Sequence, residues 1–135
     1  MYDQLSKHEE YLANRIVDIA IGVHQYLGPG LTAGVYEQCF CYELRKRGID
    51  FKKHVNAPII YDDLTIDDGL RIDILVDGLI IVQVKTQEIE HPIWEAQLLS
   101  YLKLTKLQLG FVLNFHVPVM KDGIKRVVLP ATKAN

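Results

Sequence analysis

The sequence lacks any apolar run long enough to cross a membrane. A transmembrane helix needs roughly 18 or more consecutive apolar residues, and no stretch approaches that length. The first ten residues, MYDQLSKHEE, have neither the basic start nor the apolar centre of a secretory signal peptide. We therefore expect a cytoplasmic protein that does not contact membranes.

Cysteine is scarce, and its two positions exclude a disulfide framework. Cys39 and Cys41 lie two residues apart in a predicted helix, which places them about 200° apart around its axis. They are not expected to bond each other or to share a metal ion, so we interpret both as reduced packing residues. The five histidines show no spacing typical of metal ligands.

Excess positive charge is also absent. The formal net charge is −2, so the chain as a whole does not attract nucleic acid electrostatically. Any such contact must use local clusters of Lys and Arg. These clusters are 45–47, 52–53, 103 with 106, and 121 with 125–126.

What is present is the composition of a folded domain. Of the 135 residues, 49% are hydrophobic and 24% are charged, which is typical of a globular chain. A chain of this length buries about two-thirds of its unfolded surface. We assign residues 1–135 to a single domain.

Hydrophobic periodicity and turn residues predict the order α-α-β-β-β-α-β-β. Helices are expected over 6–27, 32–47 and 93–106. Strands are expected over 51–61, 71–76, 80–85, then 109–115 with 117–120 as one strand in two pieces, and 124–129. Turns are expected at 62–63, 67–69 and 121–123. This order indicates an α/β fold in which helices flank a mixed β-sheet.

The stretch 71–85, RIDILVDGLIIVQVK, reads as a buried hairpin with polar residues inside it. Asp73, Gln83 and Lys85 interrupt two strands that are otherwise almost entirely aliphatic. A buried polar group without a partner costs roughly 2–7 kcal/mol. Such residues therefore need a structural or functional reason.

The turn of this hairpin decides whether the polar residues meet. A two-residue loop at Asp77-Gly78 would turn Asp73 away from Gln83. A three-residue loop over 76–78, with Gly78 left-handed, would put Asp73, Gln83 and Lys85 on one face. We predict this second geometry. It pairs Leu75 with Leu79 and Asp73 with Ile81.

Two helices carry further candidate residues. Glu37 shares an apolar stripe with Cys41 and Leu44, so its carboxylate either reaches solvent or faces a site that favours negative charge. Gln97 and Tyr101 are four residues apart and lie on one helical face. Taken alone, both patterns are also explained by an exposed acid and an ordinary amphipathic helix.

Together these positions resemble the PD-(D/E)XK nuclease superfamily, whose signature is an acid in one strand and an acid-x-Lys motif in the next. The corresponding residues are Asp73 and Gln83-Val84-Lys85. A helical glutamate that precedes the strands corresponds to Glu37. The Gln-x-x-x-Tyr helix of the RecB-like branch corresponds to Gln97 and Tyr101. The resemblance implies a restriction-endonuclease-like core.

More narrowly, the chain resembles the small bacterial GxxExxY proteins over about residues 16–128. Their name motif corresponds to residues 34–40, GVYEQCF, with Phe40 where the name has Tyr. The stretches LGPGL, YELRKRGI, EAQLLSYLKLT and NFHVP are similar as well.

The resemblance implies a nuclease that binds Mg²⁺ or Mn²⁺ and hydrolyses DNA phosphodiester bonds. The implied metal ligands are Asp73, the side chain of residue 83 and the backbone carbonyl of Val84. Glu37 would hold a second ion or position waters, and Lys85 would orient the attacking water or neutralise charge on the phosphate. Gln97 and Tyr101 would contact the substrate.

Gln83 departs from the superfamily pattern, which has Glu or Asp at this position. An amide oxygen brings no charge, so weak metal affinity is expected. The chain is then a nuclease with a high metal requirement, or an impaired relative that binds nucleic acid or a protein partner. A further interpretation is that Gln83 is an engineered substitution.

Two other hypotheses are a structural or dimerising protein, whose polar hairpin residues satisfy one another, and a nuclease homodimer that spans a duplex.

Overall fold

A computed structural model describes residues 2–3 and 5–132. The helices are α1 (Lys7–Leu27), α2 (Ala33–Lys46) and α3 (Ile93–Thr105), and a 3₁₀ helix η1 spans Met120–Gly123. The strands are β1 (Tyr2–Asp3), β2 (Phe51–Tyr61), β3 (Leu64–Val76), β4 (Ile80–Lys85), β5 (Leu109–Asn114), β6 (Ile124–Val128) and β7 (Ala131–Thr132).

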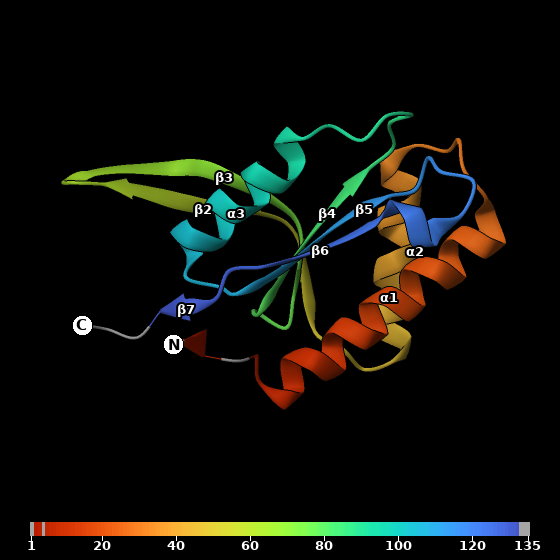
Figure 1. Cartoon of the computed structure of the whole chain (residues 1–135), viewed down its shortest axis with the longest axis horizontal. Helices are drawn as coiled ribbons and strands as arrows, with labels where there is room; N and C mark the ends of the chain where they lie inside the picture. The colour runs from red at the N-terminus through yellow and green to blue at the C-terminus, as the bar shows by residue number, and fades with distance from the viewer. Residues whose placement is uncertain (1, 4, 133–135) are drawn as a thin grey trace.

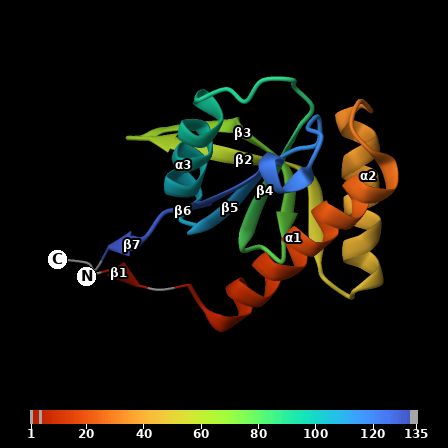
Figure 2. The ribbon, with the colours of Figure 1, turned by 45° about the vertical axis from the view of Figure 1, so that its right-hand side comes forward.

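In the described residues, five strands form the central sheet in the order β2-β3-β4-β5-β6. Strands β4 and β5 are parallel, and the other neighbours are antiparallel. Helices α1 and α2 cover one face and α3 covers the other (Figures 1 and 2). The predicted mixed α/β fold and its element order are therefore confirmed, and the arrangement is consistent with a restriction-endonuclease-like core.

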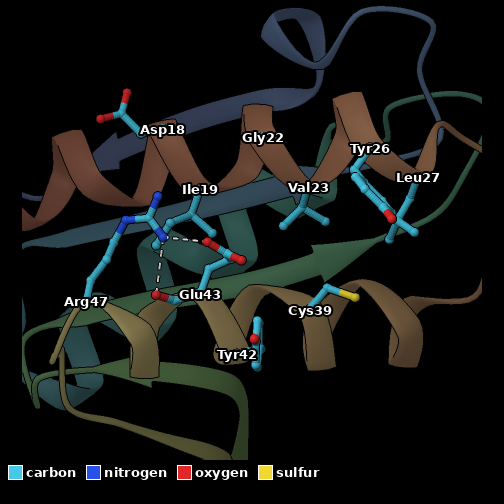
Figure 3. A pocket seen from close by; sticks show the side chains of 10 residues that line it. All are labelled: Asp18, Ile19, Gly22, Val23, Tyr26, Leu27, Cys39, Tyr42, Glu43 and Arg47. Carbon is cyan, nitrogen blue, oxygen red and sulfur yellow. Dashed lines mark hydrogen bonds and ion pairs between the residues drawn. The ribbon is translucent and has the colours of Figure 1, made fainter.

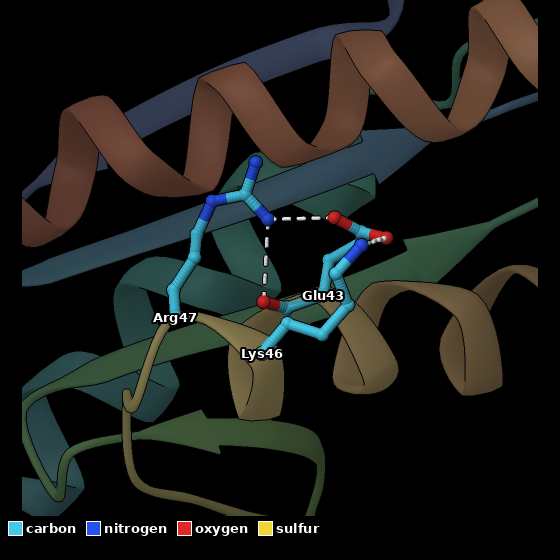
Figure 4. A network of polar contacts seen from close by, with 3 residues as sticks. All are labelled: Glu43, Lys46 and Arg47. Atoms are coloured by element: carbon cyan, nitrogen blue, oxygen red, sulfur yellow. Dashed lines mark hydrogen bonds and ion pairs between the residues drawn. The ribbon is translucent and has the colours of Figure 1, made fainter.

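Helix α1 begins and ends where local chemistry predicts, whereas α2 begins after Thr32 without a side-chain cap. Ser6 and Glu9 form a capping box at the start of α1, and Gly28 ends the helix with a positive φ of 74°. Near the end of α2, Arg47 donates to the Glu43 carboxylate at 2.7 Å (Figure 4). This hydrogen bond holds the pKa of Glu43 below its usual value.

Two apolar clusters lie on the two faces of the sheet. The cluster beneath α1 and α2 includes Ile74, Val76 and Val82 of the sheet together with fully buried Phe40. The cluster beneath α3 includes Ile72, Ile81, Trp94, Leu98 and Val112. Cys41 is buried in the first cluster, and burial raises the pKa of its thiol to about 11. Within the described residues, no helix is both long and apolar enough to cross a membrane.

The β3–β4 hairpin has a three-residue loop, as predicted, but its strand pairing differs from the predicted register. Asp77 and Gly78 are both left-handed, with φ of 53° and 67°, and the Leu79 N–H donates to the Val76 carbonyl at 2.9 Å. One extra residue, Leu79, precedes the ladder, which pairs Val76 with Ile80. The loop therefore has three residues, as predicted, but it begins one residue later. The predicted pairing of Leu75 with Leu79 is wrong, because Leu75 pairs with Ile81.

Two local assignments from the sequence are also wrong. Residues 67–69 are not a turn, because they continue β3 opposite the long strand β2. Residues 117–120 are not a strand; they lead into η1, where Gly123 packs against the end of β5. The register with β2 shifts at this point, and pairing on both sides of residues 67–69 thus overrides the local turn preference of Asp and Gly.

Gly123 provides a test of this packing. A Cβ at Gly123 would lie too close to the Asn114 backbone carbonyl and the Val117 side chain. Gly123→Ala is expected to lower the free energy of unfolding by about 1–3 kcal/mol, measured by urea denaturation. Gly22→Ala is the matched control: a Cβ there meets nothing within 4 Å, and a mid-helix alanine should stabilise by roughly 0.5–1 kcal/mol. Equal effects of the two substitutions would contradict the close approach.

Candidate active site

Asp73 lies where two strands separate. The β3–β4 ladder pairs residues 74–76 with 80–82 and extends no further toward Asp73. Beyond this ladder the Asp73 Oδ2 atom accepts a hydrogen bond from the Val84 backbone N–H at 2.9 Å. The carboxylate is partly exposed. It therefore takes the place of a backbone partner at the opening between β3 and β4.

The Gln83 side chain bridges the same opening. Its Oε1 atom accepts from the Asp73 backbone N–H at 2.7 Å, and its Nε2 atom donates to the Arg71 carbonyl at 3.1 Å. The residue is 7% exposed. Both heteroatoms of the amide are thus bonded to the β3 backbone, which a carboxylate could not do because it has no donor.

The backbone of Val84 offers a further oxygen near Asp73. Within a strand, the N–H and C=O of one residue point to the same edge. Because the Val84 N–H is directed to Asp73, its carbonyl faces the opening between β3 and β4 as well. The next carbonyl, that of Lys85, accepts from the Phe115 N–H on the β5 side, which agrees with this alternation.

Lys85 ends β4 on the face covered by α3. Its ammonium lies 5.8 Å from the centre of the Trp94 ring, a cation–π distance, and the residue is half-buried. In the described part of the chain it forms no ion pair with Asp73. A direct contact between these two residues, which would favour a purely structural role, is therefore not what the structure shows.

Glu37 is a buried acid on α2 and is held by a histidine from the sheet. The residue is 8% exposed, and its Oε1 atom lies 2.9 Å from the Nε2 atom of His54 in β2. No role for His54 is expected from the sequence. It is a lone histidine inside the predicted strand 51–61, and this pattern does not reveal a partner 17 residues earlier.

The two predicted substrate residues of α3 differ in their surroundings. The Tyr101 hydroxyl accepts a hydrogen bond from the Arg71 backbone N–H at 3.3 Å. Because the Arg71 carbonyl bonds to Gln83, Tyr101 is connected to the bridge across the opening. Gln97 lies one helical turn earlier and is exposed. Its side chain is therefore free to meet a ligand from solvent.

Asn114 is a second residue that sequence analysis missed. Its amide donates to the Gln87 carbonyl at 2.8 Å and accepts from the Gln87 and His116 N–H groups at 3.1 and 3.2 Å. It is 5% exposed at the end of β5. Asn114 therefore fixes the segment that leads from Lys85 to α3. In the sequence, Asn114 is marked only as an amide at the end of an apolar strand.

An apolar groove lies away from these residues, between α1 and α2 (Figure 3). It has a volume of about 380 Å³ and is lined by residues such as Ile19, Val23, Cys39 and Tyr42. None of the predicted site residues lines it. We therefore do not place the candidate site in this groove.

The model for the PD-(D/E)XK nuclease superfamily matches residues 10–127. The chain belongs to the PD-(D/E)XK nuclease superfamily. Searches of curated proteins and of solved structures found no significant match. Members of this superfamily generally use divalent metal ions, which makes the opening between β3 and β4 the relevant place to test for a metal.

The donors at this opening suit a hydrated Mg²⁺ or Mn²⁺, but they are few. Asp73 and the Val84 carbonyl supply the oxygen chemistry these ions prefer, whereas the Gln83 oxygen is engaged by the Asp73 N–H. Among residues 2–3 and 5–132, no three His, Cys, Asp or Glu side chains are close enough to hold a metal ion together. A superfamily site with Gln83 thus combines the right ligand type with low charge.

The hydrogen bonds of Gln83 predict how its replacement changes stability. In Gln83→Glu, one carboxylate oxygen would face the Arg71 carbonyl without a proton, which should cost about 1–3 kcal/mol of unfolding free energy at pH 7 in EDTA. The pKa of the new carboxyl should rise, because its protonated form can donate to that carbonyl. The loss should therefore grow as the pH is raised from about 4 to 7.

Gln83→Leu is the control for charge, because it removes both hydrogen bonds and cannot titrate. Its destabilisation should be the same at both pH values. Urea denaturation of both variants and the native chain measures the difference. A Gln83→Glu effect that does not change with pH would show that the side chain is not held against the β3 backbone.

Proposed function

We propose that the protein is a divalent-metal-dependent nuclease that hydrolyses DNA phosphodiester bonds, with activity limited by Gln83. The observation that carries this proposal is the Asp73 carboxylate, held by the Val84 N–H at the opening between β3 and β4. Lys85 directly follows Val84 at the end of β4. This is the order of acid and lysine that the superfamily uses.

Each side chain has a role in the proposed reaction. Asp73 and the Val84 carbonyl would bind a Mg²⁺ or Mn²⁺ ion, which when bound polarises the scissile phosphate and lowers the pKa of a water. Lys85 would neutralise charge that develops on the phosphate. Glu37 would position waters near the site. Gln97 and Tyr101 would donate hydrogen bonds to the substrate.

Gln83 limits this reaction through charge. A unit charge about 4 Å from another contributes roughly 4 kcal/mol at an effective dielectric of 20. Replacing the superfamily acid with an amide removes this attraction for the metal, and solvent screens part of the difference. A loss of 1.4 kcal/mol is tenfold in affinity, so metal binding should be weaker by about two orders of magnitude or more.

Restoring the acid should therefore increase activity. With supercoiled plasmid and Mn²⁺, we expect slow nicking by the native chain and at least tenfold faster nicking by Gln83→Glu. The Mn²⁺ concentration for half-maximal rate should fall by about 100-fold. Initial rates measured over a Mn²⁺ titration test this.

The matched control is Asp73→Asn in the Gln83→Glu background. Its amide oxygen still accepts from the Val84 N–H, so the fold is kept while the charge is lost. Cleavage should disappear. If neither the native chain nor Gln83→Glu cuts DNA at any Mn²⁺ concentration, the nuclease proposal is wrong.

A second candidate is a module that binds nucleic acid without cutting it. The observation that favours it is the Gln83 amide, both of whose polar atoms are already bonded to the β3 backbone. Binding would then depend on local positive charge. Lys52 and Lys53 are exposed on β2 immediately before His54, and Lys53 pairs with Ile74, the neighbour of Asp73 in β3.

Salt dependence tests this candidate. Binding of labelled duplex DNA in EDTA should weaken as salt is raised, with a logarithmic slope that reports the number of phosphates neutralised. The double variant Lys52→Gln, Lys53→Gln should reduce this slope by about two units. Lys121→Gln, in the separate basic cluster near η1, should leave it unchanged. Metal-free binding that is absent, or that does not respond to salt, would exclude this second candidate.

A further inference from the structure

His54 has an unusual backbone conformation for a residue inside a strand. Its φ is 52°, in the left-handed region, which side chains with a Cβ rarely adopt. The β2–β3 register pairs Lys53 with Ile74 and Val55 with Ile72, and it omits the rung of His54 and Asp73. The irregularity therefore lies at the same level as the candidate site.

This conformation changes which face of the sheet the side chains occupy. Lys53 lines a groove with Cys41 and Arg45 of α2, whereas Val55 packs in the cluster beneath α3. In a regular strand these two positions would share a face, and His54 would point to the other one. The left-handed residue instead brings the imidazole to α2, where it meets Glu37.

The contact between His54 and Glu37 matters more for Glu37 than for His54. The Glu37 side chain is 11% exposed, and that of His54 is 49% exposed. A buried carboxylate requires a partner, whereas a half-exposed histidine could be hydrated. Because His54 bonds Oε1, the Oε2 atom of Glu37 is left for water or an ion.

We propose that His54 is a positioning residue for Glu37. It donates from Nε2 to Oε1, fixes the carboxylate, and so strengthens divalent-metal binding at the opening between β3 and β4. This inference rests on the proposed nuclease function and adds a residue to it. Hydrogen-bond partners of this kind change metal affinity by about 10–100-fold when they are removed.

Three substitutions of His54 separate positioning from a structural role. His54→Gly removes the donor and suits the left-handed backbone. His54→Asn also tolerates that backbone but is too short to reach Glu37. His54→Gln keeps a donor at about the reach of Nε2. All three are made in the native chain and in Gln83→Glu.

Mn²⁺ affinity is measured by isothermal titration calorimetry. We expect Gly and Asn at position 54 to weaken it by about tenfold, and Gln to keep it within about threefold of the parent. Melting temperatures in EDTA should change little for His54→Gly, because glycine relieves the left-handed backbone while the buried Glu37 carboxylate loses its partner. In plasmid cleavage by Gln83→Glu, the change should appear in the Mn²⁺ requirement and not in the KM for DNA.

Equal Mn²⁺ affinity in all three variants, with a parent that binds Mn²⁺ and cuts DNA, would overturn the role of His54 and leave the nuclease proposal intact. A parent that neither binds Mn²⁺ nor cuts DNA would overturn both. Loss of affinity in Gln as well as in Gly and Asn would also reject positioning, because a donor at the right reach should rescue it.

Discussion

The separation of β3 from β4 is the constraint on which the site depends. The ladder between them ends at Ile74 and Val82, and a separated strand leaves backbone groups that must find other partners. Here side chains satisfy them: Gln83 bonds to the Asp73 N–H and the Arg71 carbonyl, and Asp73 bonds to the Val84 N–H. The opening is thereby kept inside an otherwise aliphatic sheet.

An amide and a carboxylate at position 83 would form different hydrogen bonds with the β3 backbone. The amide has both a donor and an acceptor, so it closes the opening without help from an ion. A carboxylate has only acceptors, and its charge would lie near that of Asp73 unless a cation separated them. Gln83 therefore stabilises the fold in the absence of a metal ion.

Much of the fold follows from local patterns, such as the apolar periodicity of α1 and its capping box. The three-residue loop of the hairpin was predicted because it places Asp73 and Gln83 on one face. The loop begins one residue later than predicted. The structure differs where long-range pairing decides. Residues 67–69 have turn chemistry, yet they continue β3, because the pairs Ile59–Ile66 and Ala57–Leu70 hold the strand on both sides of this irregular stretch. The His54 conformation has only a weak local signal, because histidine is enriched at positive φ but still adopts it rarely.

One rung of the sheet connects the two acids of the candidate site. His54 and Asp73 stand at the same level of β2 and β3, where the pairing is interrupted. On one side of this rung Asp73 turns to the Val84 N–H, and on the other His54 turns to Glu37. Each carboxylate thus has a protein donor for one oxygen. The same interrupted rung thus accounts for the contacts of both acids, and neither contact requires a cation.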